Sequence, residues 1–133
     1  RAAGTSGGIT TNGVFGYGIF DHPIILDLLD AAGVTWKVYN IGFDSIVNGD
    51  GDNVFLFWKR YARDPRVTAT KKQYLADVAR GTLPNVSFIV PSFLNGWDEH
   101  PPADVSVGMG IQQELITALK ASPLWGSSAY SVT

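Results

Sequence analysis

The segment Val86–Val90 constrains the fold most, because Ser87 is its only polar residue. A strand with one face in water alternates apolar and polar side chains, whereas a strand covered on both faces does not. We therefore expect Val86–Val90 to be a strand in a sheet that is covered by helices on both sides. Such sheets are mostly parallel, since helices connect their strands.

Strand and helix signals alternate along the rest of the chain. The expected strands are rich in β-branched and aromatic residues, and the expected helices have a capping residue before an apolar run or a glycine after it. In chain order we expect a helix from Asp21 to Gly33, a strand at Val34–Tyr39, a short helix at Val54–Arg63, a helix at Thr70–Arg80, the strand Val86–Val90, a helix at Asp104–Ala121 and a strand at Ser128–Thr133.

This order predicts one α/β domain over residues 1–133, with three layers and about three parallel strands joined by crossover helices. Neighbouring parallel strands are joined by short right-handed crossovers. We therefore expect Ser128–Thr133 to pair with Val86–Val90 through the helix Asp104–Ala121. A three-stranded sheet leaves unprotected edges, so we also expect the isolated chain to self-associate or to be poorly soluble.

The spacing of apolar residues predicts which helix faces are buried, and the residue types predict the caps. Residues three and four positions apart lie on one face of a helix. Asp, Thr and Ser can accept hydrogen bonds from the free N–H groups at a helix start. The expected buried faces are Ile25, Leu28, Leu29 and Ala32 in the first helix and Val107, Ile111, Leu115 and Leu119 in the last, with Asp21, Thr70 and Asp104 as caps.

Composition excludes several classes of protein. The 133 residues include no cysteine, which excludes disulfides, zinc–thiolate sites and thiol catalysis. The net charge is −2 and no basic stripe is present, so we expect no nucleic-acid partner. No apolar run approaches the roughly 20 residues of a membrane span, so we expect no transmembrane segment.

The loop after Val86–Val90 carries three titratable residues, Asp98, Glu99 and His100. In a parallel α/β sheet, ligands bind at loops that follow the carboxyl ends of strands. Two carboxylates beside an imidazole favour its protonated form, which can bind a phosphoryl oxygen or protonate a leaving oxygen. The same residues also suit a polar loop in which Pro101 and Pro102 stiffen the entry to the helix. The residues alone leave both interpretations open.

Two other glycine-rich segments resemble functional motifs. Gly4–Gly8 fits the G-x-S-x-G pattern of a nucleophile elbow, with Ser6 as the nucleophile. A nucleophile elbow is a sharp turn that needs a strand before it, and only three residues precede Gly4. The segment from Asn48 resembles a calcium loop, but Asn53 and Lys59 occupy the positions of its required glycine and glutamate. We therefore expect a flexible loop and a solvated turn, and no metal site within this chain.

Four segments, taken together and in their order, carry a resemblance to a known family. The segments are Arg1–Ser6, Leu28–Tyr39 (LLDAAGVTWKVY), Gly81–Ile89 (GTLPNVSFI), and Asp98–Pro102 (DEHPP) with Asp104, Val105, Gly108, Ala118, Leu119, Ser122, Pro123 and Trp125. They resemble a broad phosphoesterase family that includes bacterial phospholipases C, plant non-specific phospholipases C and some acid phosphatases.

The resemblance implies a fold similar to that of alkaline phosphatase and a full-length enzyme that hydrolyses phosphate esters. The family's Glu-Asn metal motif and hydroxyl nucleophile would precede Arg1, and its Tyr-Asp-Glu motif would follow Thr133. The chain therefore resembles the central part of a longer catalytic domain. We expect it to be inactive alone, without a cofactor of its own, whereas the full-length enzyme would use a divalent metal.

The resemblance also implies roles for individual residues. We expect His100 to be catalytic, and Asp98, Glu99 and Ser6 to bind substrate. The expected partners are a phosphate ester or phospholipid and the remainder of the catalytic domain, and the expected location is secreted or periplasmic. Two alternatives stay open: a non-catalytic α/β binding module, and a serine esterase that uses Ser6 with His100.

Overall fold

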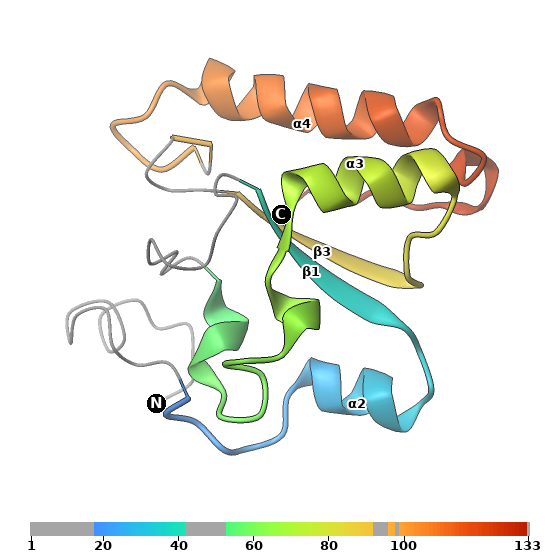
Figure 1. Ribbon diagram of the computed structural model, residues 1–133. Helices are drawn as coiled ribbons and strands as arrows, with labels where there is room; N and C mark the ends of the chain where they lie inside the picture. Colours follow the sequence, from blue (N-terminus) through green and yellow to red (C-terminus); the bar gives the residue numbers. More distant parts are fainter. Residues whose placement is uncertain (1–17, 42–52, 92–95, 98, 133) are drawn as a thin grey trace.

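The computed structural model describes residues 18–41, 53–91, 96–97 and 99–132 (Figure 1). Its sheet has three strands, β1 (Trp36–Ile41), β2 (Ala69–Thr70) and β3 (Val86–Pro91), in the order β2-β1-β3. Both neighbours of β1 run parallel to it. The predicted α/β fold with a parallel sheet is therefore confirmed.

The central strand β1 organises the sheet. Its register with β3 runs without a break from Trp36 opposite Val86 to Ile41 opposite Pro91. Side chains alternate between the faces of a strand. Trp36 and Val38 therefore belong to the core on one side, and Tyr39 and Ile41 to the core on the other.

Helices cover both faces of this sheet. The helices α3 (Lys71–Arg80) and α4 (Val105–Lys120) lie together on one face, while α2 (Ile25–Ala31) lies on the other (Figure 1). Tyr74 and Val78 of α3 pack with Leu115 of α4 in one core. Leu26 of α2 packs in the other core, with residues of the short 3₁₀ helices η2 (Val54–Phe57) and η3 (Pro65–Val67).

The predicted strand at Ser128–Thr133 is wrong for the described residues. Ser128–Val132 follows the 3₁₀ helix η4 (Trp125–Ser127) and forms no strand, and the partner of β3 is β1. The third strand is β2, which directly precedes α3. The helix α3 connects β2 to β3 across β1, which lies between them in the sheet. The neighbour of β3 is therefore a strand earlier in the chain, and not the segment that follows α4. Self-association of the chain stays a prediction.

The start and the buried face of α2 also differ from the prediction. The cap is Ile24, whose N–H donates to Asp27 Oδ2 at 2.6 Å, and Asp21 does not cap the helix. Leu26 is fully buried, whereas Ile25 and Leu28 are 48% and 64% exposed. Of the predicted face, Leu29 is partly buried and packs against the same core as Leu26, while Ala32 is exposed. The helix has seven residues, and its buried side is centred on Leu26.

The two longer helices follow the predicted caps. Thr70 accepts from the N–H of Gln73, and Gly81 ends α3 with a positive φ of 71°. Asp104 accepts from the N–H of Ser106 at 2.9 Å, which starts α4. Leu115 and Leu119 are buried as predicted, and Ile111 is partly buried against the same core. Val107 is 43% exposed, and the buried residue at this end of the helix is Gly108, against which Glu99 packs.

Two further boundaries shift. The strand predicted at Val34–Tyr39 lies at Trp36–Ile41. The short helix predicted at Val54–Arg63 is limited to the 3₁₀ turn η2, and turns follow it up to Arg63. Asn53 begins η2 by accepting a hydrogen bond from the N–H of Phe55, which favours a single tight turn over a regular helix.

Candidate active site at the carboxyl edge of the sheet

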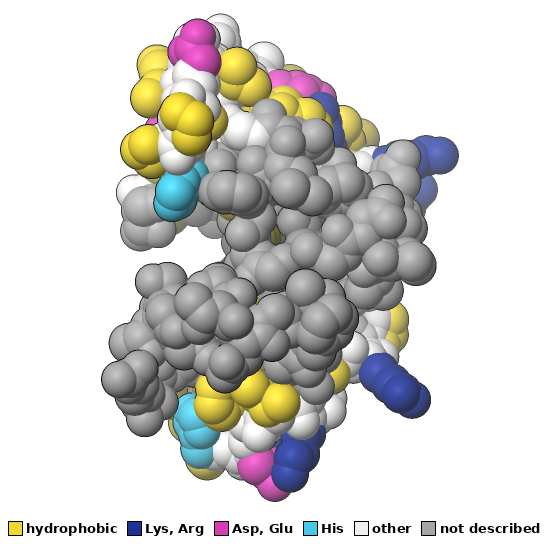
Figure 2. Space-filling model, turned by 90° about the vertical axis from the view of Figure 1, so that its left-hand side faces the viewer, with side chains coloured by type: hydrophobic (Ala, Val, Ile, Leu, Met, Phe, Trp, Pro, Cys, Tyr) yellow, Lys and Arg dark blue, Asp and Glu magenta, His cyan; other side chains and the backbone are white. Residues whose placement is uncertain are grey.

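The carboxyl ends of β1 and β3 lie at the same edge of the sheet as the start of α4 (Figure 1). Glu99 and His100 lie on the connection between β3 and α4, just before the cap of α4. Figure 2 views the molecule from this side and shows hydrophobic side chains beside histidine at its upper rim. Asp98 and Ser6 lie outside the described residues, so their predicted roles and the serine-esterase alternative stay predictions.

The ring of His100 is exposed and its Nδ1 lies 2.7 Å from the carbonyl oxygen of Pro101. A carbonyl oxygen can only accept a hydrogen bond, so Nδ1 donates and carries a proton. Nε2 is then the ring nitrogen that could face a substrate. This arrangement suits a general acid or a hydrogen-bond donor toward an oxygen of a substrate.

The side chain of Glu99 lies along α4. Its Oε1 accepts a hydrogen bond from Gln112 Nε2 at 3.1 Å, and its backbone has a φ of 61°, a value that side-chain-bearing residues rarely adopt. Glu99 also lies directly against the buried Gly108. Sequence analysis missed both helix residues as part of this site. Two signals were present: Gly108 belongs to the segment that carries the family resemblance, and its four-residue spacing from Gln112 places the two on one face of a helix.

Lys71 is a cation at this edge that sequence analysis also missed. It is the first residue of α3, directly after β2, and its Nζ lies 5.6 Å from the centre of the Trp97 ring. The same Nζ lies 2.6 Å from Glu114 Oε2 on α4. Lys71 therefore links α3, α4 and the loop that carries His100.

A pocket of about 670 Å³ extends from this loop along the outer side of β3. Trp97 and Glu99 line its end at the carboxyl edge, and His100 is not among the described residues that line it. The walls include Ser87 and Ile89 of β3 and Ile111 and Leu115 of α4. Tyr74 also lines the pocket, and burial, followed by the nearby Tyr130, raises the pKa of Tyr74 to about 12. The Tyr74 hydroxyl is therefore neutral at physiological pH.

The described residues do not fit a metal ion on their own. Among them, no three His, Asp or Glu side chains come together in a way that could hold one. Asp104 is occupied as a helix cap, and the hydrogen bonds from the side chain and the backbone of Ser106 hold its pKa below the ordinary value.

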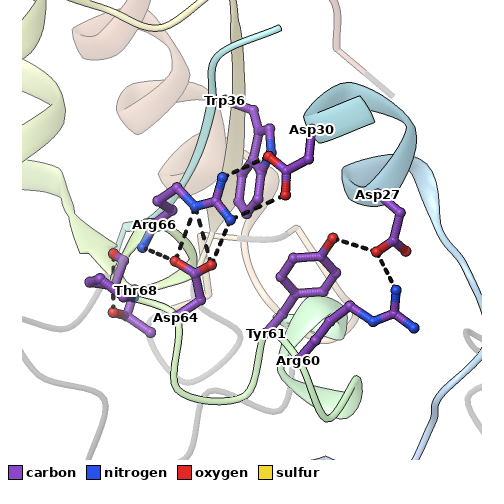
Figure 3. Close-up of polar contacts among 9 residues, drawn as sticks. Asp27, Asp30, Trp36, Arg60, Tyr61, Asp64, Arg66 and Thr68 are labelled. Carbon is purple, nitrogen blue, oxygen red and sulfur yellow. Dashed lines mark hydrogen bonds and ion pairs between the residues drawn. The ribbon is translucent and has the colours of Figure 1, made fainter. Parts of the chain in front are cut away.

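A second polar cluster lies on the α2 side of the sheet (Figure 3). Arg66 binds both Asp30 and Asp64, and its guanidinium lies over the ring of Trp36. Its partners are carboxylates of this chain that its charge already neutralises. The hydrogen bonds of Arg66 hold the pKa of Asp30 below the ordinary value. We assign this cluster to stability, because it joins α2 to η3.

Fold and loop together define an α/β protein with titratable side chains at the carboxyl edge of a parallel sheet. The model of the phosphoesterase family matches residues 2–133, so the chain belongs to the phosphoesterase family, as the sequence resemblance predicts.

Three relatives show how the match is distributed. The chain is 32% identical to phospholipase C A of Mycobacterium tuberculosis over 98% of its own length and 27% of that protein. It is 31% identical to phospholipase C B of the same organism, over 85% of the chain and 23% of that protein. Non-specific phospholipase C5 of Arabidopsis thaliana is 26% identical over 86% of the chain and 22% of that protein. The chain thus spans about a quarter of the length of these relatives.

Proposed function

We propose that this chain forms part of the catalytic domain of a phosphoric ester hydrolase whose substrate is a phosphate ester or a phospholipid. The observation that supports the proposal most is the family match over residues 2–133, together with His100 on the β3–α4 connection. Loops at the carboxyl edge of a parallel sheet are the usual place for such chemistry.

In this proposal His100 acts through Nε2. With Nδ1 donating to the Pro101 carbonyl oxygen, a protonated ring can direct its Nε2–H at an oxygen of the phosphate ester. It would either protonate the leaving oxygen or stabilise charge on a phosphoryl oxygen. Phosphate-ester hydrolysis also needs an in-line nucleophile and a cation, and the cation is usually a divalent metal. We propose that the nucleophile and the ligands of the metal come from parts of the protein beyond these 133 residues.

The test uses the protein in its natural length and a chromogenic diester, bis(4-nitrophenyl) phosphate. We expect His100→Ala to lower kcat about 10²–10⁴-fold, the usual scale for general acid catalysis, with a smaller change in KM. His100→Asn should recover part of the loss if the ring acts as a hydrogen-bond donor, and little if it transfers a proton. Unchanged turnover in His100→Ala would contradict the proposal.

His22 offers a matched control. It is also exposed, and it lies before α2, where its ring contacts Phe20 and Trp58 on the α2 side of the sheet. We expect His22→Asn to keep kcat within about twofold, because the substitution removes an imidazole of similar exposure away from the β3–α4 connection. An equal loss of turnover in both variants would show that the effect is not specific to His100.

We further propose that residues 1–133 are inactive alone and that the natural protein is secreted or periplasmic. The isolated chain, assayed on the same diester with added divalent metals, should not exceed a blank that contains only metal. Turnover well above that blank, abolished by His100→Ala, would contradict the proposal. Fractionation of the producing cells tests the location. Among the described residues, no helix is long and apolar enough to cross a membrane.

A further inference from the structure

Gly108, in the first turn of α4, is the residue on which the side chain of Glu99 rests. A Cβ added at Gly108 would lie 2.8 Å from Glu99 Oε1 and 3.0 Å from Glu99 Cδ. Non-bonded carbon atoms prefer separations of about 3.5–4.0 Å, so any side chain at this position would displace Glu99. Gly110, two residues further along, has no such neighbour within 4 Å. Only the first of these two glycines is therefore required by its surroundings.

Three restraints act together on Glu99. Its backbone is held in the left-handed region, its Oε1 binds Gln112 Nε2 at 3.1 Å, and its aliphatic part occupies the space that a Cβ of Gly108 would fill. Gly108 and Gln112 are one helical turn apart on the same face of α4. The Glu99 carboxyl group lies beside Gly108, and the longer side chain of Gln112 reaches back to donate to it. The Glu99 carboxylate is therefore held at one place, against the first turn of α4.

The same restraints reach His100, which is the next residue. The loop is fixed at one end by Glu99 on α4 and at the other by Asp104, which caps that helix. Between them, the N–H of Ala103 donates to the carbonyl oxygen of His100 at 2.9 Å. A segment this short, held at both ends to one helix, places the backbone of His100, and the contact of Nδ1 with the Pro101 carbonyl oxygen at 2.7 Å then orients the ring.

We propose that Gly108 and Gln112 are positioning residues for phosphate-ester hydrolysis: they hold Glu99 against α4 and thereby fix the direction of the His100 ring. The inference rests on the function proposed above. Glu99 then has a positioning role as well, because its carboxylate accepts a hydrogen bond from Gln112 instead of binding the substrate.

A double-substitution cycle in the protein of natural length tests this coupling. We expect Gly108→Ala to lower kcat on bis(4-nitrophenyl) phosphate about 10–100-fold with little change in KM, because small misplacements of a catalytic group are costly. Glu99→Ala should cause a similar loss. Adding Gly108→Ala to Glu99→Ala should cost nothing further, because the shortened side chain at position 99 has no atoms where the new methyl group lies. Losses that multiply in the double variant would overturn the proposal.

Two matched controls separate this effect from general changes in α4. Gly110→Ala makes the same chemical change on the same helix and should leave kcat within about twofold. Gln112→Leu removes the donor to Glu99 and should lower kcat, whereas Gln113→Leu changes the exposed neighbour and should not. If the Gly108→Ala variant does not fold, Gln112→Leu still tests whether the contacts of Glu99 affect turnover. An equal loss of kcat in Gly108→Ala and Gly110→Ala, or in Gln112→Leu and Gln113→Leu, would contradict the proposal.

The ring of His100 provides a readout that does not depend on turnover. With ¹³C-labelled histidine, the NMR signal that is missing in His100→Asn belongs to His100. It should shift in Gly108→Ala and Gln112→Leu, and stay in place in Gly110→Ala and Gln113→Leu. A signal that is unmoved by Gly108→Ala and Gln112→Leu overturns the positioning role even if His100→Ala abolishes activity. A signal that moves as expected, with His100→Ala fully active, keeps the geometric coupling and overturns the proposed function.

Discussion

The guanidinium carbon of Arg66 lies 4.0 Å from the centre of the Trp36 ring, and both side chains bind the same carboxylate, Asp30. The indole N–H of Trp36 donates to Asp30 Oδ1 at 2.7 Å, and Arg66 donates to the same oxygen at 2.7 Å (Figure 3). Since Trp36 lies in the central strand and Asp30 is in the last turn of α2, this contact attaches the helix to the sheet.

We expect Arg66→Lys to destabilise the protein by about 1 kcal/mol. Lysine keeps the charge but loses the planar group that stacks on Trp36 and reaches Asp30 and Asp64 together. The magnitude is modest because the Arg66 side chain is 42% exposed and solvent weakens its ion pairs. Urea unfolding followed by circular dichroism measures the change. Arg63→Lys, at an exposed position in the same segment, should change stability by less than half as much.

Acid should weaken the fold through Asp77, whose side chain is only 15% exposed. Burial raises the pKa of Asp77, but the hydrogen bonds from Lys37 and Tyr39 outweigh it, so the pKa lies below the ordinary 3.8. A carboxyl with a lower pKa in the folded state stabilises above its unfolded pKa and loses that contribution as pH falls through the folded value.

We therefore expect the free energy of unfolding to decrease below about pH 4 and the decrease to be smaller in Asp77→Asn. Chemical denaturation at a series of pH values from neutral to strongly acidic measures this. Asp21→Asn is the control, because the Asp21 carboxylate is exposed and its ion pairs are long, 3.5 Å to Lys59 and 3.7 Å to Arg60. If both variants keep the full acid dependence, another carboxyl is responsible.

Local signals predicted the parts of the fold that depend on neighbouring residues. Thr70, Gly81 and Asp104 act as helix boundaries because each acts on backbone groups within a few positions of itself. The strand β2 could not be predicted in this way, since two residues show no period. The pairing of β1 with β3 is a contact between distant segments, and the residue pattern of Ser128–Thr133 does not reveal which strand is preferred as the neighbour.

The candidate site also combines features that could be predicted from the sequence with features that could not. Its place after a buried strand could be predicted from Val86–Val90 and the titratable loop. The role of Gly108 could not, because a glycine within a helix says nothing about which side chain approaches it. The direction of the Glu99 carboxylate also depends on Gln112, thirteen residues away, and becomes apparent only when the loop and helix are seen together.

Asn53 is fully buried, and both the donor and the acceptor of its side-chain amide are used in hydrogen bonds. Its Nδ2 donates to Val67 O at 2.8 Å and to Asn40 Oδ1 at 3.0 Å, and its Oδ1 accepts from the N–H of Phe55. Asn53→Asp replaces a donor by an acceptor that faces two other acceptors. A buried group left without its partners is costly, so we expect a loss of about 3 kcal/mol.

Thermal unfolding at neutral pH measures this loss, and Asn85→Asp is the matched control. Asn85 is exposed, and its Oδ1 only accepts, from the N–H and the hydroxyl of Thr35. An aspartate at position 85 keeps both hydrogen bonds, so its effect should be below about 0.5 kcal/mol, as for most surface substitutions. Equal effects at the two positions would contradict the role assigned to the Asn53 amide.

Gly81 and Gly33 separate backbone strain from steric contact. Both have positive φ values, of 71° and 67°, which alanine adopts at a cost of about 1–2 kcal/mol. An added Cβ at Gly33 meets nothing within 4 Å, whereas one at Gly81 would lie 3.0 Å from Pro123 Cγ. We therefore expect Gly33→Ala to destabilise by the backbone cost alone and Gly81→Ala by more. Replacing Pro123 by alanine should reduce the effect of Gly81→Ala to that of Gly33→Ala, measured by urea unfolding of the single and double variants. If Gly81→Ala costs the same with and without Pro123, the turn after α3 is held by its backbone conformation and not by its contact with the segment that follows α4.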